Sequence, residues 1–197
     1  MYCEIVLVQH ALTQWNLEGK CQGHTDVPLN EQGWKMTHVL AKRLEDDDFT
    51  CIYTSDLKRA YQTALPIIAQ KDIPLYREKG LREARWKNQQ HCKQFVTLPF
   101  YVEHEEEADV YRRAIDVMGG IAQKHIGEKI LVISHGGLIN RFMKYIKAQS
   151  GQTEPTYQKI RMAINRLKYE NDRWFFLEIN DIAHLPKMDV KRILDYG

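Results

Sequence analysis

Two histidines each follow an apolar run that has the character of a buried strand. His10 comes after residues 5–8 with Gln9 between, and His135 comes after residues 129–133 with Ser134 between. Continuous β-branched and aliphatic runs are typical of strands buried on both faces of a parallel sheet. Ligands bind beyond the carboxyl ends of such strands. The pattern therefore predicts two imidazoles that face one pocket at the same edge of a sheet.

The segments that must position these histidines alternate between strand and helix patterns. The alternation predicts a three-layer α/β sandwich with a mainly parallel central sheet flanked by helices. Asn30 is the expected N-cap of the first long helix, and Ser55 or Asp56 that of the second, in which Pro66 should either cause a kink or lie in a break. Helices are expected at residues 30–44, 57–70, 109–124, 138–148 and 189–196, and further strands at 49–54, 73–76, 162–169 and 174–179, the last two turning at Asn171 and Asp172.

Length and charge narrow the class of protein. With 197 residues, the chain is expected to form a single domain over residues 1–197. Its 28 basic and 26 acidic residues nearly balance, which argues against the clustered basic face of a nucleic-acid-binding protein. No apolar run is long enough to span a bilayer, so no membrane partner is expected. Residues 77–108 are the least regular part of the sequence, and within them residues 87–108 are expected to be an insertion that covers the pocket.

The four cysteines are scattered and contain no Cys-x-x-Cys pair. This spacing favours free thiols in a reducing compartment over disulfides or a structural zinc site. Met1 and the residues after it lead straight into a strand pattern without the features of a signal peptide. A cytoplasmic location is therefore expected. The cysteines are Cys3, Cys21, Cys51 and Cys92.

The segment around His10 resembles the signature of the histidine phosphatase superfamily, the phosphoglycerate-mutase-like proteins. The likeness extends over most of the chain, with six fragments in the order and spacing of that family. It is most similar to the small phosphatase branch, which includes α-ribazole phosphatase. The fragments are residues 7–16, 23–30, 53–64, 81–83, 132–137 and 180–185.

The resemblance implies roles for four residues in phosphoryl transfer. His10 would attack phosphorus through a neutral imidazole and hold the group as a phosphohistidine. Arg59 and a protonated His135 would stabilise the charge on the equatorial oxygens of the transition state. Glu83 would protonate the departing oxygen and then deprotonate the attacking water, which requires a pKa raised by its surroundings.

The resemblance also implies the ligand environment. Gln9, Asn16, Gln22, Gly23 and Gly136 would bind the phosphate or the substrate, Gly136 at a helix N-terminus that suits an anion. No metal or other cofactor is implied, because histidine and arginine carry out the charge stabilisation. The expected partner is a small phosphorylated substrate, and a homodimer is a possible assembly.

Two positions depart from the family pattern. The family places arginine directly before its nucleophilic histidine and usually glycine after it, where this chain has Gln9 and Ala11. A glutamine amide donates hydrogen bonds but brings no charge, and losing one preorganised donor typically costs ~10²–10³ in rate. Lys20, Arg82 or Arg85 could replace the lost charge.

These observations predict a phosphatase that acts on a small phosphomonoester through a phosphohistidine, weakened by Gln9. One alternative is a weak or inactive relative that binds a phosphorylated ligand. A further alternative is a phosphoglycerate mutase, which ranks last because the chain is short for that branch and lacks its glycines after Glu83.

Overall fold

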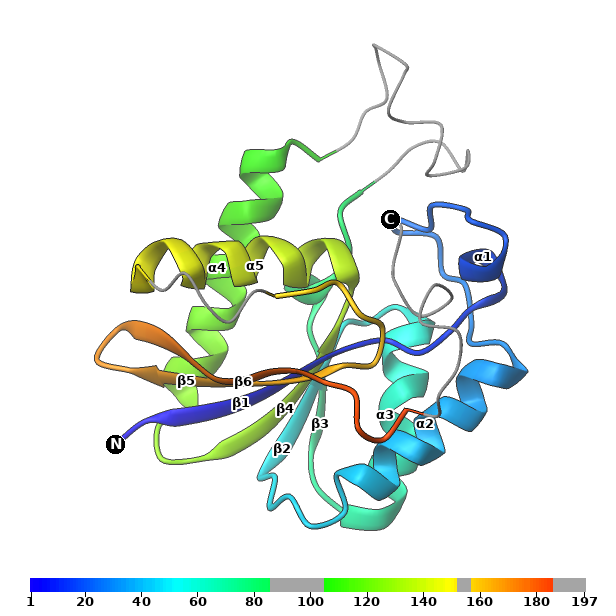
Figure 1. Ribbon diagram of the computed structural model, residues 1–197, viewed down its shortest axis with the longest axis horizontal. Helices are drawn as coiled ribbons and strands as arrows, with labels where there is room; N and C mark the ends of the chain where they lie inside the picture. Colours follow the sequence, from blue (N-terminus) through cyan, green and yellow to red (C-terminus); the bar gives the residue numbers. More distant parts are fainter. Residues whose placement is uncertain (86–104, 152–156, 186–197) are drawn as a thin grey trace.

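The central feature of the fold is one six-stranded sheet with the strand order β3-β2-β4-β1-β5-β6. The computed structural model describes residues 1–85, 105–151 and 157–185. Strands β3, β2, β4 and β1 run parallel to one another, β5 is antiparallel to β1, and β6 is antiparallel to β5 and so runs in the direction of the parallel strands (Figure 1). The strands are β1 (Cys3–Gln9), β2 (Cys51–Thr54), β3 (Leu75–Arg77), β4 (Lys129–Ser134), β5 (Ile164–Glu170) and β6 (Arg173–Asp181).

Helices cover both faces of this sheet. Helices α4 and α5 lie on one face and α2 and α3 on the other, which confirms the expected three-layer α/β fold (Figure 1). Helix α5 begins at Gly136 rather than at Leu138, directly after the second strand-terminal histidine. The helices are α1 (Gln14–Leu17), α2 (Glu31–Arg43), α3 (Lys58–Lys71), α4 (Glu107–Lys124) and α5 (Gly136–Ser150), with a short 3₁₀ helix, η1 (Lys79–Leu81).

The apolar run of β1 is continuous because the strand is buried on both faces. Successive side chains of a strand point to opposite faces, so Ile5 and Leu7 pack into the core beneath α4 and α5. Val6 and Val8 pack into the second core, beneath α2 and α3. All four side chains have no exposed surface. Two-sided burial fixes the register of β1, since a slip of one residue would exchange the two faces.

The register between β1 and β4 places the two histidines side by side. Gln9 pairs with Ser134 at the end of the parallel ladder. The residues that follow, His10 and His135, therefore leave the sheet at the same edge. The backbone N–H of His10 extends the ladder by donating to the carbonyl of Ser134 at 2.9 Å.

The N-cap of α2 was predicted correctly and that of α3 was not. The side chain of Asn30 accepts a hydrogen bond from the N–H of Gly33 at 2.7 Å. The cap residue of α3 is Leu57, and the carboxylate of Asp26, distant in sequence, accepts from the N–H of Lys58 at 2.6 Å. The N–H at the start of α3 is thus satisfied by a tertiary contact, which the residues next to it in the sequence do not predict. Pro66 lies inside α3 rather than in a break between helices.

The hairpin at the end of the described chain follows the prediction. Asn171 and Asp172 join β5 to β6 with φ angles of 51° and 57°. Two consecutive left-handed residues form the tight turn whose twist matches that of the flanking strands, and asparagine and aspartate tolerate this conformation.

The cysteine prediction is only partly correct. Cys3 and Cys51 are buried free thiols. Cys21 is disulfide-bonded, so the expectation of four free thiols is wrong. Sequence spacing shows which cysteines are near one another along the chain, and folding decides which are near in space.

Two predicted segments lie outside the described residues: most of the insertion at residues 87–108, and the helix at residues 189–196. Of the former, residues 107 and 108 belong to α4. Among the described helices, none is both long and apolar enough to cross a membrane.

Candidate active site

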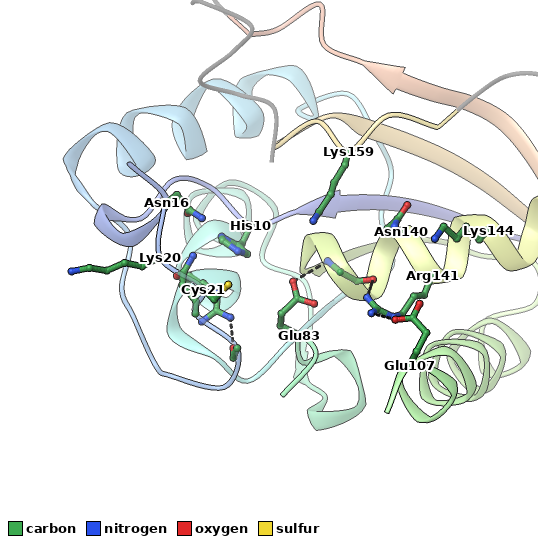
Figure 2. Close-up of a pocket in the computed structure, with 14 residues that line it drawn as sticks. His10, Asn16, Lys20, Cys21, Glu83, Glu107, Asn140, Arg141, Lys144 and Lys159 are labelled. Atoms are coloured by element: carbon green, nitrogen blue, oxygen red, sulfur yellow. Dashed lines mark hydrogen bonds and ion pairs between the residues drawn. The ribbon is translucent and has the colours of Figure 1, made fainter. Parts of the chain in front are cut away.

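A pocket of about 330 Å³ opens at the carboxyl edge of the parallel strands. Figure 2 shows His10 at the end of β1 on one side of this pocket and Glu83 below the first turn of α5. The described residues that line it are His10, Asn16, Lys20, Cys21, Gln22, Gly23, Arg59, Glu83, Glu107, Gly137, Asn140, Arg141, Lys144 and Lys159.

The imidazole of His10 is fixed in one tautomer. Its Nδ1 lies 2.7 Å from the carbonyl oxygen of Ala11. A carbonyl oxygen can only accept a hydrogen bond, so the proton must reside on Nδ1, and Nε2 keeps its lone pair. The backbone N–H of Ala11 in turn donates to the hydroxyl of Thr63 at 3.0 Å, which holds this carbonyl in place. The arrangement is that of a nucleophilic nitrogen.

His135 lies against His10 but differs from the expectation in its charge. The ring centroids are 5.1 Å apart with an angle of 59° between the planes. His135 has no exposed surface, and burial together with the charge of Arg59 lowers its pKa well below the usual range. Its imidazole is therefore neutral near pH 7, and the expected positive charge is not present on it. A phosphoryl group brought beside the ring would favour its protonation.

Arg59 lies in the first turn of α3 and is 1% exposed. Its two terminal nitrogens donate to the carbonyl oxygens of Gly23 and Thr25, each at 2.8 Å. The guanidinium thus holds the loop at Gly23 against the pocket and contributes a buried positive charge beside His10. Burial, together with the charges of Arg161 and Arg59, holds the pKa of His10 well below its usual range.

The carboxylate of Glu83 is held at the N-terminus of α5. Its oxygens accept from the N–H groups of Gly137 at 2.9 Å and Leu138 at 3.1 Å, and from the N–H of Ala84 at 2.8 Å. These are the donors that the sequence suggested for a phosphate. They hold the carboxylate instead, and an acidic group at a helix N-terminus is electrostatically favourable.

Three side chains that the sequence did not single out hold the backbone around Glu83. Nε2 of His24 donates to the carbonyl oxygen of Glu83 at 2.8 Å. Arg113 of α4 donates to the carbonyls of Gly80 and Arg82 at 2.8 and 2.7 Å. The hydroxyl of Ser134 donates to the carbonyl of Leu81 at 2.7 Å. No local pattern marks these residues, because each acts from another element of the fold.

Gly137 leaves no room for a side chain beside Glu83. A Cβ at this position would lie 2.2 Å from Oε1 of Glu83. We expect Gly137→Ala to displace the carboxylate and to lower kcat/KM by about 10²-fold, the cost typical of a 1 Å misplacement. Steady-state kinetics on any accepted phosphomonoester measures this effect.

Gly119→Ala is the matched control for this prediction. Gly119 lies inside α4, and a Cβ there meets no atom within 4 Å. This change should stabilise the protein by about 0.5–1 kcal/mol and leave the kinetics unchanged. Equal kcat/KM values for the two variants would refute the fixed position of Glu83.

The other expected ligand residues divide into two groups. Asn16, Gln22 and Gly23 line the pocket, and Figure 2 shows the amide nitrogen of Asn16 on the side of His10. Gln9 and Gly136 are buried and do not line it, and Gly137 takes the place expected for Gly136.

Of the three residues that could replace the missing charge at position 9, one lines the pocket and two do not. Arg82 is held outside the pocket by Asp56, with two bonds of 2.6 Å between guanidinium and carboxylate. Arg85 is exposed and does not line the pocket. Lys20 lines it and forms an ion pair with Glu18 at 2.6 Å.

Ala11, the second departure from the family pattern, is not among the residues with positive φ, so its methyl group causes no backbone strain.

The bidentate pair of Asp56 and Arg82 gives a pH-dependent stability. Hydrogen bonding from Arg82 lowers the pKa of Asp56. We expect Asp56→Asn to destabilise the protein at pH 7 by about 1 kcal/mol, since both side chains are partly exposed. The contribution is fully present above the unfolded pKa and is lost as pH falls through the native pKa. Thermal unfolding should therefore show a difference in Tm that shrinks below about pH 4. A difference that stays constant at lower pH would contradict this assignment.

Comparisons with known proteins show the family to which this chain belongs. The model of the histidine phosphatase superfamily (branch 1) matches residues 5–182. The chain is 30% identical to phosphoglycerate mutase-like protein 4 of Arabidopsis thaliana, covering 94% of this chain and 88% of that protein. It is 28% identical to the metal-independent phosphoserine phosphatase of the same plant, covering 94% and 84%. The chain therefore belongs to the histidine phosphatase superfamily, and the predicted phosphatase class is confirmed.

Solved structures share the fold. YhfR of Bacillus stearothermophilus superposes with a TM-score of 0.81 at 25% identity, over 93% of this chain and all of that chain. A mutant phosphoserine phosphatase of Entamoeba histolytica gives a TM-score of 0.75 at 21% identity, with 93% and 100% coverage.

Proposed function

We propose that the protein hydrolyses small phosphomonoesters, with His10 as the nucleophile and Glu83 as general acid and base. The observation that carries this proposal is the fixed tautomer of His10. A buried, neutral imidazole whose Nδ1 proton is engaged leaves Nε2 as the attacking atom. Arg59 would stabilise charge on the transferring group, and His135 would gain a proton as that charge arrives.

The pocket lining points to substrates with a second anionic group. Arg141, Lys144 and Lys159 lie along the part of the pocket away from Asn16 (Figure 2). Glu107 pairs with Arg141, and the lining as a whole carries more basic than acidic side chains. A carboxylate next to the phosphoester would find complementary charge there. Two crystals of the Entamoeba phosphoserine phosphatase support this chemistry, since they hold phosphoserine and 3-phosphoglyceric acid.

A panel of phosphomonoesters with product phosphate measured tests the proposal. 3-Phosphoglycerate and glycerol 3-phosphate form a matched pair, because they differ in the carboxylate. We expect phosphate release from both, with a higher kcat/KM for the carboxylate-bearing ester. Equal kcat/KM values for the two esters would show that the pocket does not recognise a second anionic group.

The same panel separates the two alternatives. A protein that binds without chemistry would show affinity for phosphoesters and release no phosphate. A phosphoglycerate mutase would convert 3-phosphoglycerate to 2-phosphoglycerate instead of hydrolysing it.

The location, partners and oligomeric state of the protein remain predictions. We propose a cytoplasmic location and a small phosphorylated substrate as the partner; the disulfide of Cys21 removes the support that four free thiols would have given to this location. The balanced charge supports the expectation that it does not bind nucleic acid. Size-exclusion chromatography with light scattering would test the expected homodimer.

A further inference from the structure

The amide at position 9 leaves the site one cation short of the family pattern. Gln9 is 3% exposed and lies directly before His10 in the buried end of β1. A second buried cation nevertheless lies beside His10. It is Arg161, which is 2% exposed and belongs to the segment between α5 and β5.

The antiparallel pairing of β5 brings Arg161 to this edge of the sheet. Val8 of β1 pairs with Ile164, the first residue of β5. Residues before β5 therefore run alongside residues after β1. A turn closed by the N–H of Ala163 and the carbonyl of Ile160, at 3.2 Å, contains Arg161 and places it beside His10.

The contacts show how Arg161 acts on the imidazole. Its Nη1 lies 3.4 Å from the carbonyl oxygen of His10 and 3.5 Å from Nδ1 of the same residue. Because the Nδ1 proton already donates to Ala11, this nitrogen cannot accept from the guanidinium. The guanidinium therefore donates to the backbone of His10 and influences the ring through its charge.

We propose that Arg161 is a positioning residue for the His10 nucleophile and supplies, from the segment before β5, the buried positive charge that position 9 does not carry. The proposal rests on the phosphatase function argued above. The charge disfavours a second proton on the ring, which keeps the lone pair of Nε2, and it favours the negative phosphoryl group once this is attached. Other charged or titratable groups also face His10 or its pocket: Arg59 from α3, His135 after β4, Glu83 from the segment after η1, and the pocket-lining side chains of Lys20, Glu107, Arg141, Lys144 and Lys159.

Substitution of Arg161 by glutamine removes the charge and keeps a donor. We expect Arg161→Gln to lower kcat/KM by about 10²–10³-fold, as for loss of one preorganised electrostatic contact to the transition state. The pKa of His10 should rise, which moves the acid limb of the pH profile of kcat/KM to higher pH. Arg161→Lys keeps the charge, so its acid limb should stay at the wild-type position.

Arg166→Gln is the matched control. Arg166 lies in β5 and donates two bonds of 2.8 Å to Asp47, away from the pocket. This variant should lose stability without any change in the pH profile. If Arg161→Gln behaves in the same way, the role of Arg161 is only structural and the proposal is wrong.

A change at a second site gives the sharpest test of whether Arg161 replaces the charge that is missing at position 9. Gln9→Arg in the wild type should be neutral or harmful, because a third arginine would join Arg161 and Arg59 around one ring. In the Arg161→Gln background the same change should restore kcat/KM by about tenfold or more, as expected for recovery of a charge-assisted contact. Equal effects of Gln9→Arg in both backgrounds would show that the two positions are independent, against the proposal.

Titration of the His10 ring by NMR separates this proposal from the proposed function. If the wild type hydrolyses no phosphomonoester, the proposed function fails, and the titration still reports whether Arg161→Gln raises the pKa of His10. An unchanged titration refutes the role of Arg161 whatever the activity. Should Arg161→Gln not fold, Arg161→Lys decides: a shifted titration in this charge-conserving variant would also contradict the proposal.

Discussion

Replacement of His10 by alanine is expected to abolish turnover, with kcat falling by a factor on the order of 10⁴–10⁶, as when a nucleophile is removed from other enzymes. The reason is the two-step route, in which Nε2 forms a bond to phosphorus before water attacks. Brief incubation of the wild type with labelled substrate should leave phosphate on the protein that is labile in acid and stable in base, because a phosphoramidate hydrolyses in acid. His10→Ala should carry no such label.

His38→Ala is a suitable control for this experiment, since His38 is exposed on α2, outside the pocket lining. It should retain both turnover and the labelled intermediate. Turnover that survives His10→Ala undiminished would show that another nucleophile, or a metal-bound water, performs the chemistry.

Glu83→Gln is expected to have the second largest effect, and the effect should depend on the leaving group. Glutamine has the shape of glutamate but cannot transfer a proton. For an alkyl phosphomonoester, which departs as a poor leaving group, kcat/KM should fall by about 10²–10⁴-fold. For p-nitrophenyl phosphate, whose phenolate leaves without protonation, the loss should be much smaller.

Glu107→Gln provides the comparison, because Glu107 lines the same pocket and pairs with Arg141. Its removal should change KM for both substrates similarly. Equal losses of kcat/KM on the two substrates in Glu83→Gln would exclude a general-acid role. They would be consistent with Glu83 serving chiefly to hold the N-terminus of α5 in place.

The sequence predicted the parts of the fold whose signals are local or periodic. The two-sided burial of β1 and β4 produces uninterrupted apolar runs, and the turn at Asn171 and Asp172 uses residues suited to left-handed backbone. Because the runs end in histidines and the strands are parallel neighbours, the juxtaposition of His10 and His135 could also be predicted.

The parts that could not be predicted depend on contacts between distant segments. Asp26 caps α3 and His24 bonds to the backbone of Glu83, yet neither is marked by the residues around it. The neutral state of His135 follows from complete burial, which a sequence pattern does not give. Arg161 comes beside His10 because of the antiparallel register of β5 with β1.

The pairing of β1 with β4 also has a consequence for the time course of folding. These strands are central neighbours in the sheet, although almost the whole parallel part of the chain separates them in sequence. Contacts of such long range form slowly, since the intervening chain must be ordered before the ladder closes. During synthesis, His10 emerges early and meets His135 only after β4 has emerged. Catalytic competence should therefore appear late in refolding, together with the last cooperative step, and a chain truncated before β4 should not hold its nucleophile in place.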